Sequence, residues 1–176
     1  MLQLLCDLPN LQGQKLLPRL KKHLDEGVIE QDDCWFLASM RNANPDYTIK
    51  SMQDRTGLEC FINKIHVDTY EENDLPMLLG QGFLMVKGLL EILEPRGVFN
   101  IILDLSRSLD EKRPFMTANV RFHKVRQNEK WLNPDLDKNQ SNALLVFTTD
   151  KQPNSGMISQ DKWPEIELEN EIKILH

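Results

Sequence analysis

The spacing of apolar residues predicts one long helix in the middle of the chain. Between Leu75 and Glu94 apolar residues recur every three or four positions, and Lys87 and Glu91 are the only charged residues inside the segment. Asp74 can cap its first turn. A helix with so few charged residues must be largely covered by the rest of the protein. Three glycines inside it predict a close approach to a sheet or to another helix: Gly80, Gly82 and Gly88.

Three segments after this helix are predicted strands. Val98–Leu105 and Ala118–Arg126 alternate apolar and polar residues, so each would bury one face. Ala143–Thr148 is apolar on both faces, which is typical of a central strand. We therefore expect Ala143–Thr148 in the interior of a sheet that the long helix covers.

The N-terminal part of the chain gives a helical pattern. Leucines at helical spacing predict a helix over residues 10–26, which Pro18 either starts or kinks. A second, short helix is predicted over Asp32–Met40, with Asp32 or Asp33 as its cap.

Further strands are predicted before the long helix and at the end of the chain. Tyr47–Gln53 and Leu58–Val67 are expected to form a hairpin with a turn at Asp54–Gly57. From residue 165 to residue 175 apolar residues alternate with a row of carboxylates: Glu165, Glu167, Glu169 and Glu171. Such a row is either a solvated edge strand or a surface matched to basic residues of a partner.

Together these elements predict an α+β fold. We expect a mainly antiparallel sheet of about four to five strands, packed against the long helix, with an N-terminal helical segment beside it. The 176 residues suit a single domain. Within it we expect a helical segment over residues 1–45, an α+β core over 46–150 and an acidic strand or tail over 151–176.

Charge and cysteine content narrow the class of partner and the compartment. The formal net charge of −6 argues against nucleic acid and for a basic macromolecular partner. Cys6, Cys34 and Cys60 are widely spaced and form no CxxC pair, which predicts free thiols in a reducing compartment. No segment approaches the ~18 consecutive apolar residues of a membrane span, so we expect a cytoplasmic protein without a membrane partner.

The sequence holds no recognisable catalytic, metal or cofactor motif. No two histidines have HxxxH or HxH spacing, and no GxSxG sequence occurs. His66 and His123 could meet across the predicted sheet and, with a carboxylate, form a small hydrolase-type site. The alternative is that both are ordinary polar strand residues. The basic strand around Phe122 hints at single-stranded nucleic acid, against which the net negative charge counts.

Two longer stretches are informative as a pair. The first runs from Gly57 to Asp68, and the second from Val120 to Leu132, followed by Asp135-Leu136-Asp137. Together they resemble small bacterial immunity proteins of the kind encoded beside contact-dependent growth inhibition toxins. The resemblance covers roughly residues 55–148. It implies a cytoplasmic antidote that binds the C-terminal domain of a delivered toxin and blocks its active site.

The same resemblance implies a basic partner and no chemistry of the antidote's own. Many such toxins are nucleases with basic clefts that hold phosphates, which an acidic antidote would fit. The family has no catalytic residues to transfer. Interface residues cannot be carried over from the family. The charge pattern of this sequence makes the acidic clusters candidate partner-binding residues, together with one tryptophan that is either a core residue or an interface anchor: Glu71, Glu72, Trp131, Asp135, Asp137, Glu165, Glu167, Glu169 and Glu171. A small enzyme using His66 and His123, or a structural adaptor, remains the alternative.

Overall fold

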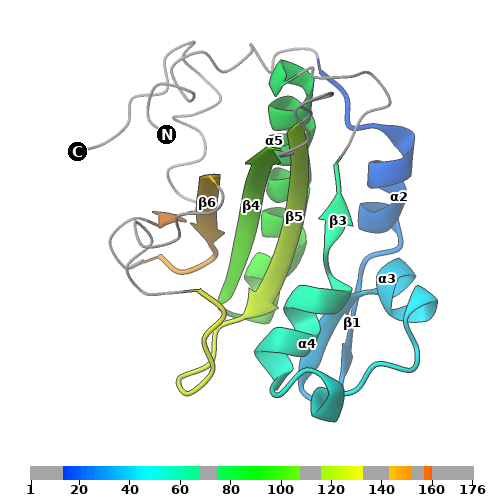
Figure 1. The fold of residues 1–176 in the computed structure, drawn as a ribbon, viewed down its shortest axis with the longest axis vertical. Helices are drawn as coiled ribbons and strands as arrows, with labels where there is room; N and C mark the ends of the chain where they lie inside the picture. Colours follow the sequence, from blue (N-terminus) through cyan, green and yellow to red (C-terminus); the bar gives the residue numbers. More distant parts are fainter. Residues whose placement is uncertain (1–13, 68–74, 108–115, 133–142, 152–156, 160–176) are drawn as a thin grey trace.

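A five-stranded sheet backed by one long helix forms the centre of the molecule. The computed structural model describes residues 14–67, 75–107, 116–132, 143–151 and 157–159 (Figure 1). The sheet order is β3-β5-β4-β6-β7: Ile65–His66 (β3), Met116–Lys124 (β5), Phe99–Arg107 (β4), Ala143–Thr148 (β6) and Ile158–Ser159 (β7). Neighbouring strands are antiparallel except β6 and β7, which are parallel. The predicted α+β class is confirmed.

Strand β6 lies inside the sheet, as its two apolar faces predicted. It pairs with β4 over its whole length and with β7 at Phe147 and Thr148. Val146 and Phe147 point to opposite faces and are both buried, while Leu145 is half-buried. The alternation in β4 and β5 is confirmed too: Leu103 lies opposite Val120, and both side chains belong to the main core.

The long helix α5 (Leu75–Leu93) covers one face of this sheet and continues into a short 3-10 turn, η2 (Glu94–Arg96). Phe83 packs edge-on against Phe147 of β6, with ring centroids 5.9 Å apart. A Cβ atom at Gly82 would lie 2.8 Å from Cδ1 of Leu103, so the helix approaches β4 as closely as its glycines predicted. The proposed cap, Asp74, lies outside the described residues.

Helix α2 (Pro18–Asp25) packs beside α5. It begins at Pro18, as one of the two readings of that proline predicted, and its Leu24 side chain occupies the space that the missing Cβ of Gly88 leaves. The buried Gln81 of α5 fixes the chain just before α2, since its Oε1 accepts from the N–H of Leu17 (2.8 Å) and its Nε2 donates to the carbonyl of Lys15 (3.0 Å).

Residues 28–37 form a hairpin, so the predicted helix over Asp32–Met40 is wrong. Strands β1 (Val28–Gln31) and β2 (Cys34–Leu37) pair antiparallel, and the short helix α3 (Ala38–Ala43) follows. The two aspartates between the strands have φ angles of 55° and 58°. Such a left-handed pair forms the tight turn whose twist suits a hairpin. The segment 1–45 is therefore not wholly helical.

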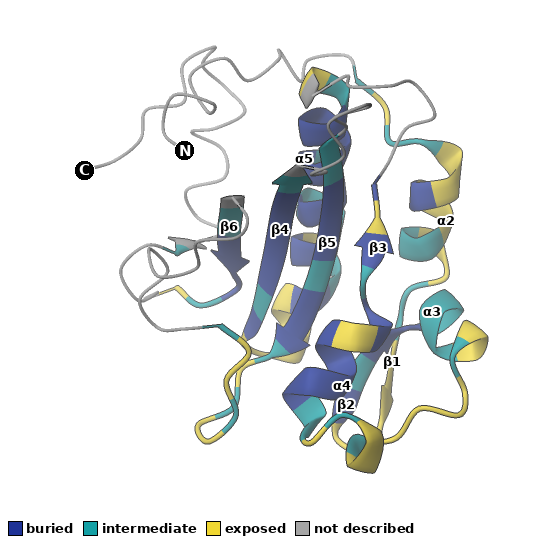
Figure 2. Ribbon diagram, viewed as in Figure 1, coloured by how far each residue is buried: buried dark blue, intermediate teal, exposed yellow. Residues whose placement is uncertain are grey.

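Residues 47–67 also differ from the prediction. A 3-10 turn, η1 (Ile49–Ser51), and helix α4 (Arg55–Ile62) replace the two predicted strands, and only Ile65–His66 is extended. Asp54 caps α4, because its carboxylate accepts a hydrogen bond from the N–H of Gly57 (2.6 Å). Figure 2 shows the largely buried α4 against the hairpin and the lower end of β5, where a second small core forms: Cys34, Phe36, Leu58 and Ile62.

Candidate functional site

The two stretches that carry the resemblance meet in space through one buried ion pair. Glu59 lies in α4, in the first stretch, and Arg126 lies just after β5, in the second. Both terminal nitrogens of Arg126 reach the carboxylate of Glu59, at 2.8 and 2.9 Å. Two parallel bonds of this kind fix the orientation of both groups as well as their distance.

Glu59 is completely buried, and its remaining acceptor capacity is used by the backbone. Its carboxylate also accepts from the N–H of Trp35 in β2 (2.7 Å) and from the N–H of Lys124 at the end of β5 (2.8 Å). One side chain therefore joins the hairpin, α4 and the main sheet. A buried charge is tolerated when it is paired and fully hydrogen-bonded, as here.

A second carboxylate, Glu129, holds the first turn of α4. It accepts from the backbone N–H and the hydroxyl of Thr56, both at 2.9 Å, and from Arg55 at 3.2 Å. Burial opposes its ionisation, but the Thr56 hydrogen bonds and the charges of Arg126 and Arg55 outweigh burial and lower the pKa of Glu129. The turn containing Glu129 is thereby fixed to α4.

Asp33 in the hairpin turn completes the contacts at this end of the sheet. Its carboxylate accepts from Lys124 at 3.0 Å, which lowers the pKa of Asp33, and it lies 3.6 Å from Arg55. Arg126 also donates to the backbone carbonyl of Asp33. The carboxylates of Asp33, Glu59 and Glu129 thus bind residues of the same chain.

Trp131 is the one predicted partner-binding residue that the structure describes. It is 42% exposed and lies over the guanidinium of Arg121, 5.8 Å from ring centroid to Cζ. Arg121 in turn donates to Asp104 of β4 at 2.6 Å, and Asn119 donates to the same carboxylate at 3.2 Å. Trp131 therefore presents a partly exposed aromatic ring, supported by Arg121, on the sheet face opposite α5.

The structure does not bring His66 and His123 together. His66 pairs with Asn119, four residues from His123 along β5, a separation of roughly 13 Å at the usual strand rise. His123 is buried and its Nδ1–H donates to the carbonyl of Lys124 (3.0 Å). Burial lowers the pKa of His123. The side chain therefore stays neutral near pH 7 and is held in place by the main chain.

The two described cysteines are free and buried, as predicted for reduced thiols. Burial raises the pKa of Cys34 to about 11 and that of Cys60 well above its ordinary value. Thiols of this kind are poor nucleophiles because the thiolate is the reactive form. Across the ranges that the structure describes, no three His, Cys, Asp or Glu side chains gather where they could hold a metal ion.

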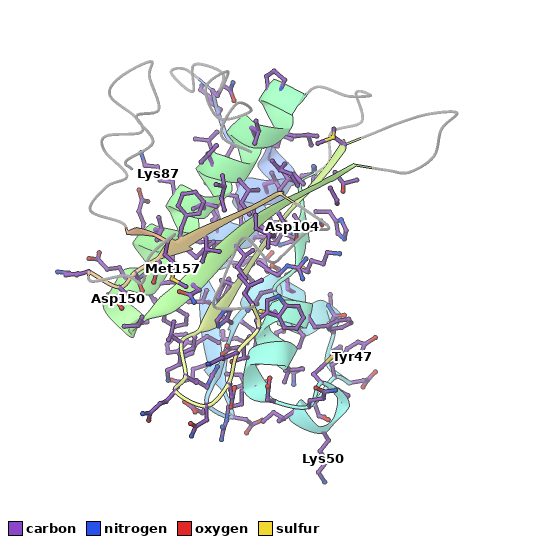
Figure 3. The ribbon with its side chains drawn as sticks, turned by 60° about the vertical axis from the view of Figure 1, so that its left-hand side comes forward. Tyr47, Lys50, Lys87, Asp104, Asp150 and Met157 are labelled. Atoms are coloured by element: carbon purple, nitrogen blue, oxygen red, sulfur yellow. The ribbon has the colours of Figure 1, made fainter. Side chains whose placement is uncertain are left out.

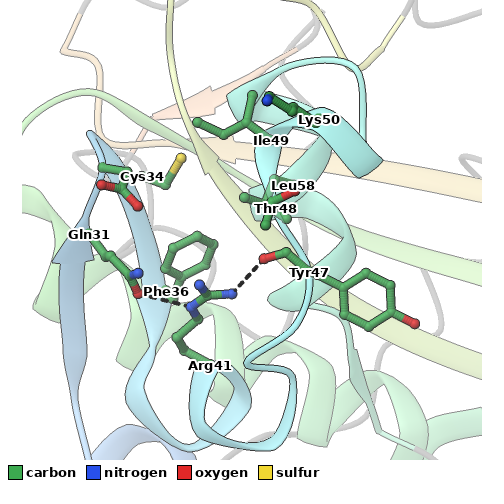
Figure 4. Close-up of a pocket in the computed structure, with 10 residues that line it drawn as sticks. Gln31, Cys34, Phe36, Arg41, Tyr47, Thr48, Ile49, Lys50 and Leu58 are labelled. Carbon is green, nitrogen blue, oxygen red and sulfur yellow. Dashed lines mark hydrogen bonds between the residues drawn. The ribbon is translucent and has the colours of Figure 1, made fainter.

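A pocket of about 340 Å³ opens between the β1–β2 hairpin and η1 (Figure 4). Its lining includes Phe36, Leu58 and Cys34 of the small core, with Arg41 and Lys50 among its polar residues. The sequence did not indicate this pocket, because the hairpin that forms one wall was mistaken for a helix. Two aspartates between short apolar runs, which tolerate left-handed backbone, were the signal that could have revealed the hairpin.

A comparison with protein-family models matches residues 1–162 to the uncharacterized protein PM0498 family. The chain belongs to this family. The comparisons with curated proteins and with solved structures gave no match. The matched range includes both walls of the pocket, the buried pair Glu59–Arg126 and Trp131.

The predicted acidic site residues of this PM0498-family chain lie outside the described residues: Glu71, Glu72, Asp135, Asp137, Glu165, Glu167, Glu169 and Glu171. The described residues contain 16 Lys and Arg against 13 Asp and Glu, a formal charge of +3. Since the whole chain has −6, the remaining segments carry −9. The acidity that predicted a basic partner is therefore concentrated in segments outside the described fold.

One helix of the described part, Pro76–Arg96, is long and apolar enough to cross a membrane by length and composition alone. The expectation of a protein without a membrane partner stays a prediction. Of the apolar window in this helix, 61% is buried inside the protein, and its apolar side chains form the main core with the sheet. Packing against the sheet accounts for its composition.

Proposed function

We propose that this chain is an immunity protein that binds and neutralises the C-terminal toxin domain of a contact-dependent growth inhibition system in the cytoplasm. The observation that carries the proposal is the joining of the two resemblance-bearing stretches into one packed unit by Glu59 and Arg126. A likeness carried by two separate pieces of sequence gains weight when those pieces form one structural element together.

The engagement of four of the described carboxylates supports a binding function over catalysis. Asp33, Glu59, Asp104 and Glu129 each bind a basic side chain of the same chain, which stabilises the fold. His66 and His123 lie too far apart along the sheet to share a proton or a substrate atom. A partner-binding surface needs neither free carboxylates of this set nor a pair of adjacent histidines.

The proposed partner is a nuclease with a basic cleft. The charge of −9 in the segments outside the described fold suits such a cleft, because carboxylates can occupy positions that phosphates take in the substrate. Trp131, which is close to Asp135 and Asp137 in the sequence, would supply the aromatic anchor.

The test looks for a neighbouring gene that encodes a large secreted protein and co-expresses the C-terminal domain of that protein with this chain. Growth of cells that produce this domain should be restored by the wild-type chain. Trp131→Ala should protect less while folding normally, whereas Lys130→Ala, at the exposed position beside it, should protect fully. Failure of the wild-type chain to restore growth, or the absence of any such gene, contradicts the proposal.

A further inference from the structure

The pocket between the hairpin and η1 combines an apolar floor with a fixed cation. Phe36 and Leu58 in its lining are almost completely buried. The guanidinium of Arg41 packs over the Phe36 ring, 5.2 Å from the centroid. Its volume of about 340 Å³ lies at the lower end of the roughly 300–1,000 Å³ found for ligand pockets.

Arg41 is held in place yet keeps donors to spare. Its Nε donates to Gln31 (3.0 Å), and its Nη1 donates to the carbonyls of Asn44 (3.1 Å) and Tyr47 (2.9 Å). Its other terminal nitrogen, Nη2, makes no hydrogen bond within the part of the chain that the structure describes. A guanidinium fixed in this way is already oriented for an acceptor that enters the pocket, such as a carboxylate.

The polar rim carries charges of both signs. Lys50 and Asp32 both line the pocket and are exposed, and neither has an ion-pair partner among the described residues. In Figure 4 Arg41 lies at one end and Lys50 at the other, with the Phe36 ring between them. The rim therefore offers cations for an anionic group and one carboxylate that can accept from an N–H.

Left-handed backbone at residues other than glycine lies at the hairpin tip and just after η1, and one of these residues, Asp32, lines the pocket. Among the described residues three that are not glycine have positive φ: Asp32 (55°), Asp33 (58°) and Gln53 (72°). The two aspartates form the hairpin tip, and Gln53 is the second residue after η1. Costly backbone conformations cluster at ligand-binding segments more often than elsewhere.

We propose that this pocket captures the C-terminal residue of a protein partner. The terminal carboxylate accepts from Arg41 in the field of Lys50, the apolar side chain packs on Tyr47 and Ile49 of the lining, and the peptide N–H donates to Asp32. The three groups of the captured residue match the three chemistries of the lining. This proposal rests on the proposed function for the identity of the partner. The proposed partner is a toxin domain at the end of its chain, so its C-terminal residue is the one that the pocket would capture.

An exposed aromatic pair extends the surface beside the pocket. The rings of Tyr47 and Phe61 lie 4.7 Å apart, and both remain more than a third exposed. Tyr47 also lines the pocket through the segment that precedes η1. Residues that precede the captured terminus can therefore pack on an aromatic surface, of the kind enriched in protein interfaces.

The experiment titrates the isotope-labelled full chain with two probes in NMR spectra. One probe is N-acetyl-glycyl-leucine, and the other is its C-terminal amide, which has the same shape without the charge. We expect saturable shifts for the free acid at amides around Phe36 and Tyr47–Lys50, and about tenfold weaker binding of the amide, the loss of one charge-assisted hydrogen bond.

Two charge reversals test the assignment of the cations. Lys50→Glu should weaken binding of the free acid at least about threefold, while Lys151→Glu should leave it unchanged. Lys151 follows Asp150, which Figure 3 places far from Lys50. Unperturbed spectra away from position 50 serve as the folding control. Arg41 is kept intact because it also binds the loop at Asn44 and Tyr47.

Equal binding of acid and amide, shifts that map elsewhere, or an unchanged affinity in Lys50→Glu would overturn the proposal. Its outcome is separable from that of the proposed function. If the chain fails to restore growth but binds the free acid, the pocket remains a site for chain termini and the toxin is the wrong partner. If growth is restored but neither probe binds, the toxin is bound at another surface.

Discussion

Glu59 and Arg126 are 67 positions apart in the sequence and form a two-bond ion pair that is almost wholly shielded from water. The Glu59 side chain is 0% exposed and that of Arg126 is 11% exposed. Because Glu59 also accepts from the backbone of β2 and of β5, the pair lies at the point where the hairpin, α4 and the main sheet meet. The contact therefore links the hairpin to the main sheet.

Removal of one member of this pair should destabilise the protein severely. Arg126→Met leaves the Glu59 carboxylate buried and without its cation, and we expect the free energy of unfolding to fall by about 3–5 kcal/mol. The double variant Glu59→Gln with Arg126→Met should be more stable than Arg126→Met alone, because no uncompensated charge remains. Urea unfolding measures both.

The exposed neighbour Lys130 gives the matched control for this prediction. Lys130→Met removes a cation from the same turn and should change the free energy of unfolding by no more than about 0.5 kcal/mol. If Arg126→Met is as mild as Lys130→Met, the ion pair does not hold the hairpin on the sheet, and the packing of the small core does so by itself.

The sequence predicted those elements whose hydrophobic period is clear within one segment. Helix α5 has a wide apolar stripe at helical spacing, and β4, β5 and β6 alternate or are apolar throughout. These elements form the main core and fix one another through many apolar contacts. For such segments local pattern and tertiary structure agree, which is why the α+β class and the interior position of β6 could be predicted.

Helix α4 was misread because a charged residue is buried in it. Read as a strand, residues 58–62 place the apolar Leu58, Cys60 and Ile62 on one face and Glu59 on the other face, toward water. In the structure the segment is helical and Glu59 is buried together with these three residues. The reason is Arg126, 67 positions away, which no local pattern contains.

The hairpin was misread for a related reason. Asp32 and Asp33 are good caps for a helix as well as acceptable residues for a left-handed turn. The contacts of Asp33 with Lys124 and Arg55 favour the turn, and both partners are distant in sequence. The pocket that depends on this hairpin was therefore missed as well, while Trp131 could be named because an aromatic residue beside acids stands out in the sequence alone.

Two glycines of α5 should respond differently to alanine. Alanine favours the helix by about 1 kcal/mol, but overpacking a core costs about 1–3 kcal/mol. At Gly82 the new Cβ meets Leu103, which is fully buried between two strands, so Gly82→Ala should lower the free energy of unfolding by roughly 1–2 kcal/mol. At Gly88 it meets Leu24, a half-buried side chain of α2 that can move aside.

We therefore expect Gly88→Ala to stay within about 1 kcal/mol of the wild type. Thermal and urea unfolding of the two variants under the same conditions provide the comparison. A Gly82→Ala protein as stable as Gly88→Ala would show that α5 can move away from β4 at little cost, contrary to the tight helix-to-sheet contact described above.

Stability should decline as the pH falls below about 6.5. Burial lowers the pKa of His123 in the folded state below the value of 6.5 that an unfolded chain would have. Between these two pKa values the unfolded state binds more protons, so the free energy of unfolding rises with pH in that window and is fully developed above it. NMR titration of His123 measures its pKa in the folded state, and urea midpoints at pH 5 to 7 measure how stability changes with pH.

His123→Gln should flatten the pH dependence in that window. The decline that remains is expected from His23, whose pKa burial also lowers. Glu129 and Asp33 contribute to the pH dependence of stability at lower pH than the histidines. Their pKa values are lowered in the folded state, so the stabilisation they give is lost only as the pH falls through the acidic range. A titration of His123 at or above its ordinary pKa would contradict the assignment of a buried, neutral side chain.

The acidic row at residues 165–171 should govern the rate of association with a basic partner. The described fold carries +3 and the other segments −9, so long-range attraction to a basic cleft must come from those segments. Charges of this kind raise association rates and are screened over about 8 Å at physiological salt. Reversal of Glu165, Glu167, Glu169 and Glu171 together should slow association, most strongly at low salt, and weaken protection.

Binding kinetics against the cognate toxin domain at two salt concentrations measure this effect, with circular dichroism as the folding control. The same four-fold reversal should leave the spectrum and the unfolding midpoint unchanged. The salt dependence is the decisive quantity. If the reversed chain associates as fast as the wild type at low salt, the row is a solvated edge. The steering charge must then lie in another acidic cluster, such as Glu71 and Glu72 or Asp135 and Asp137.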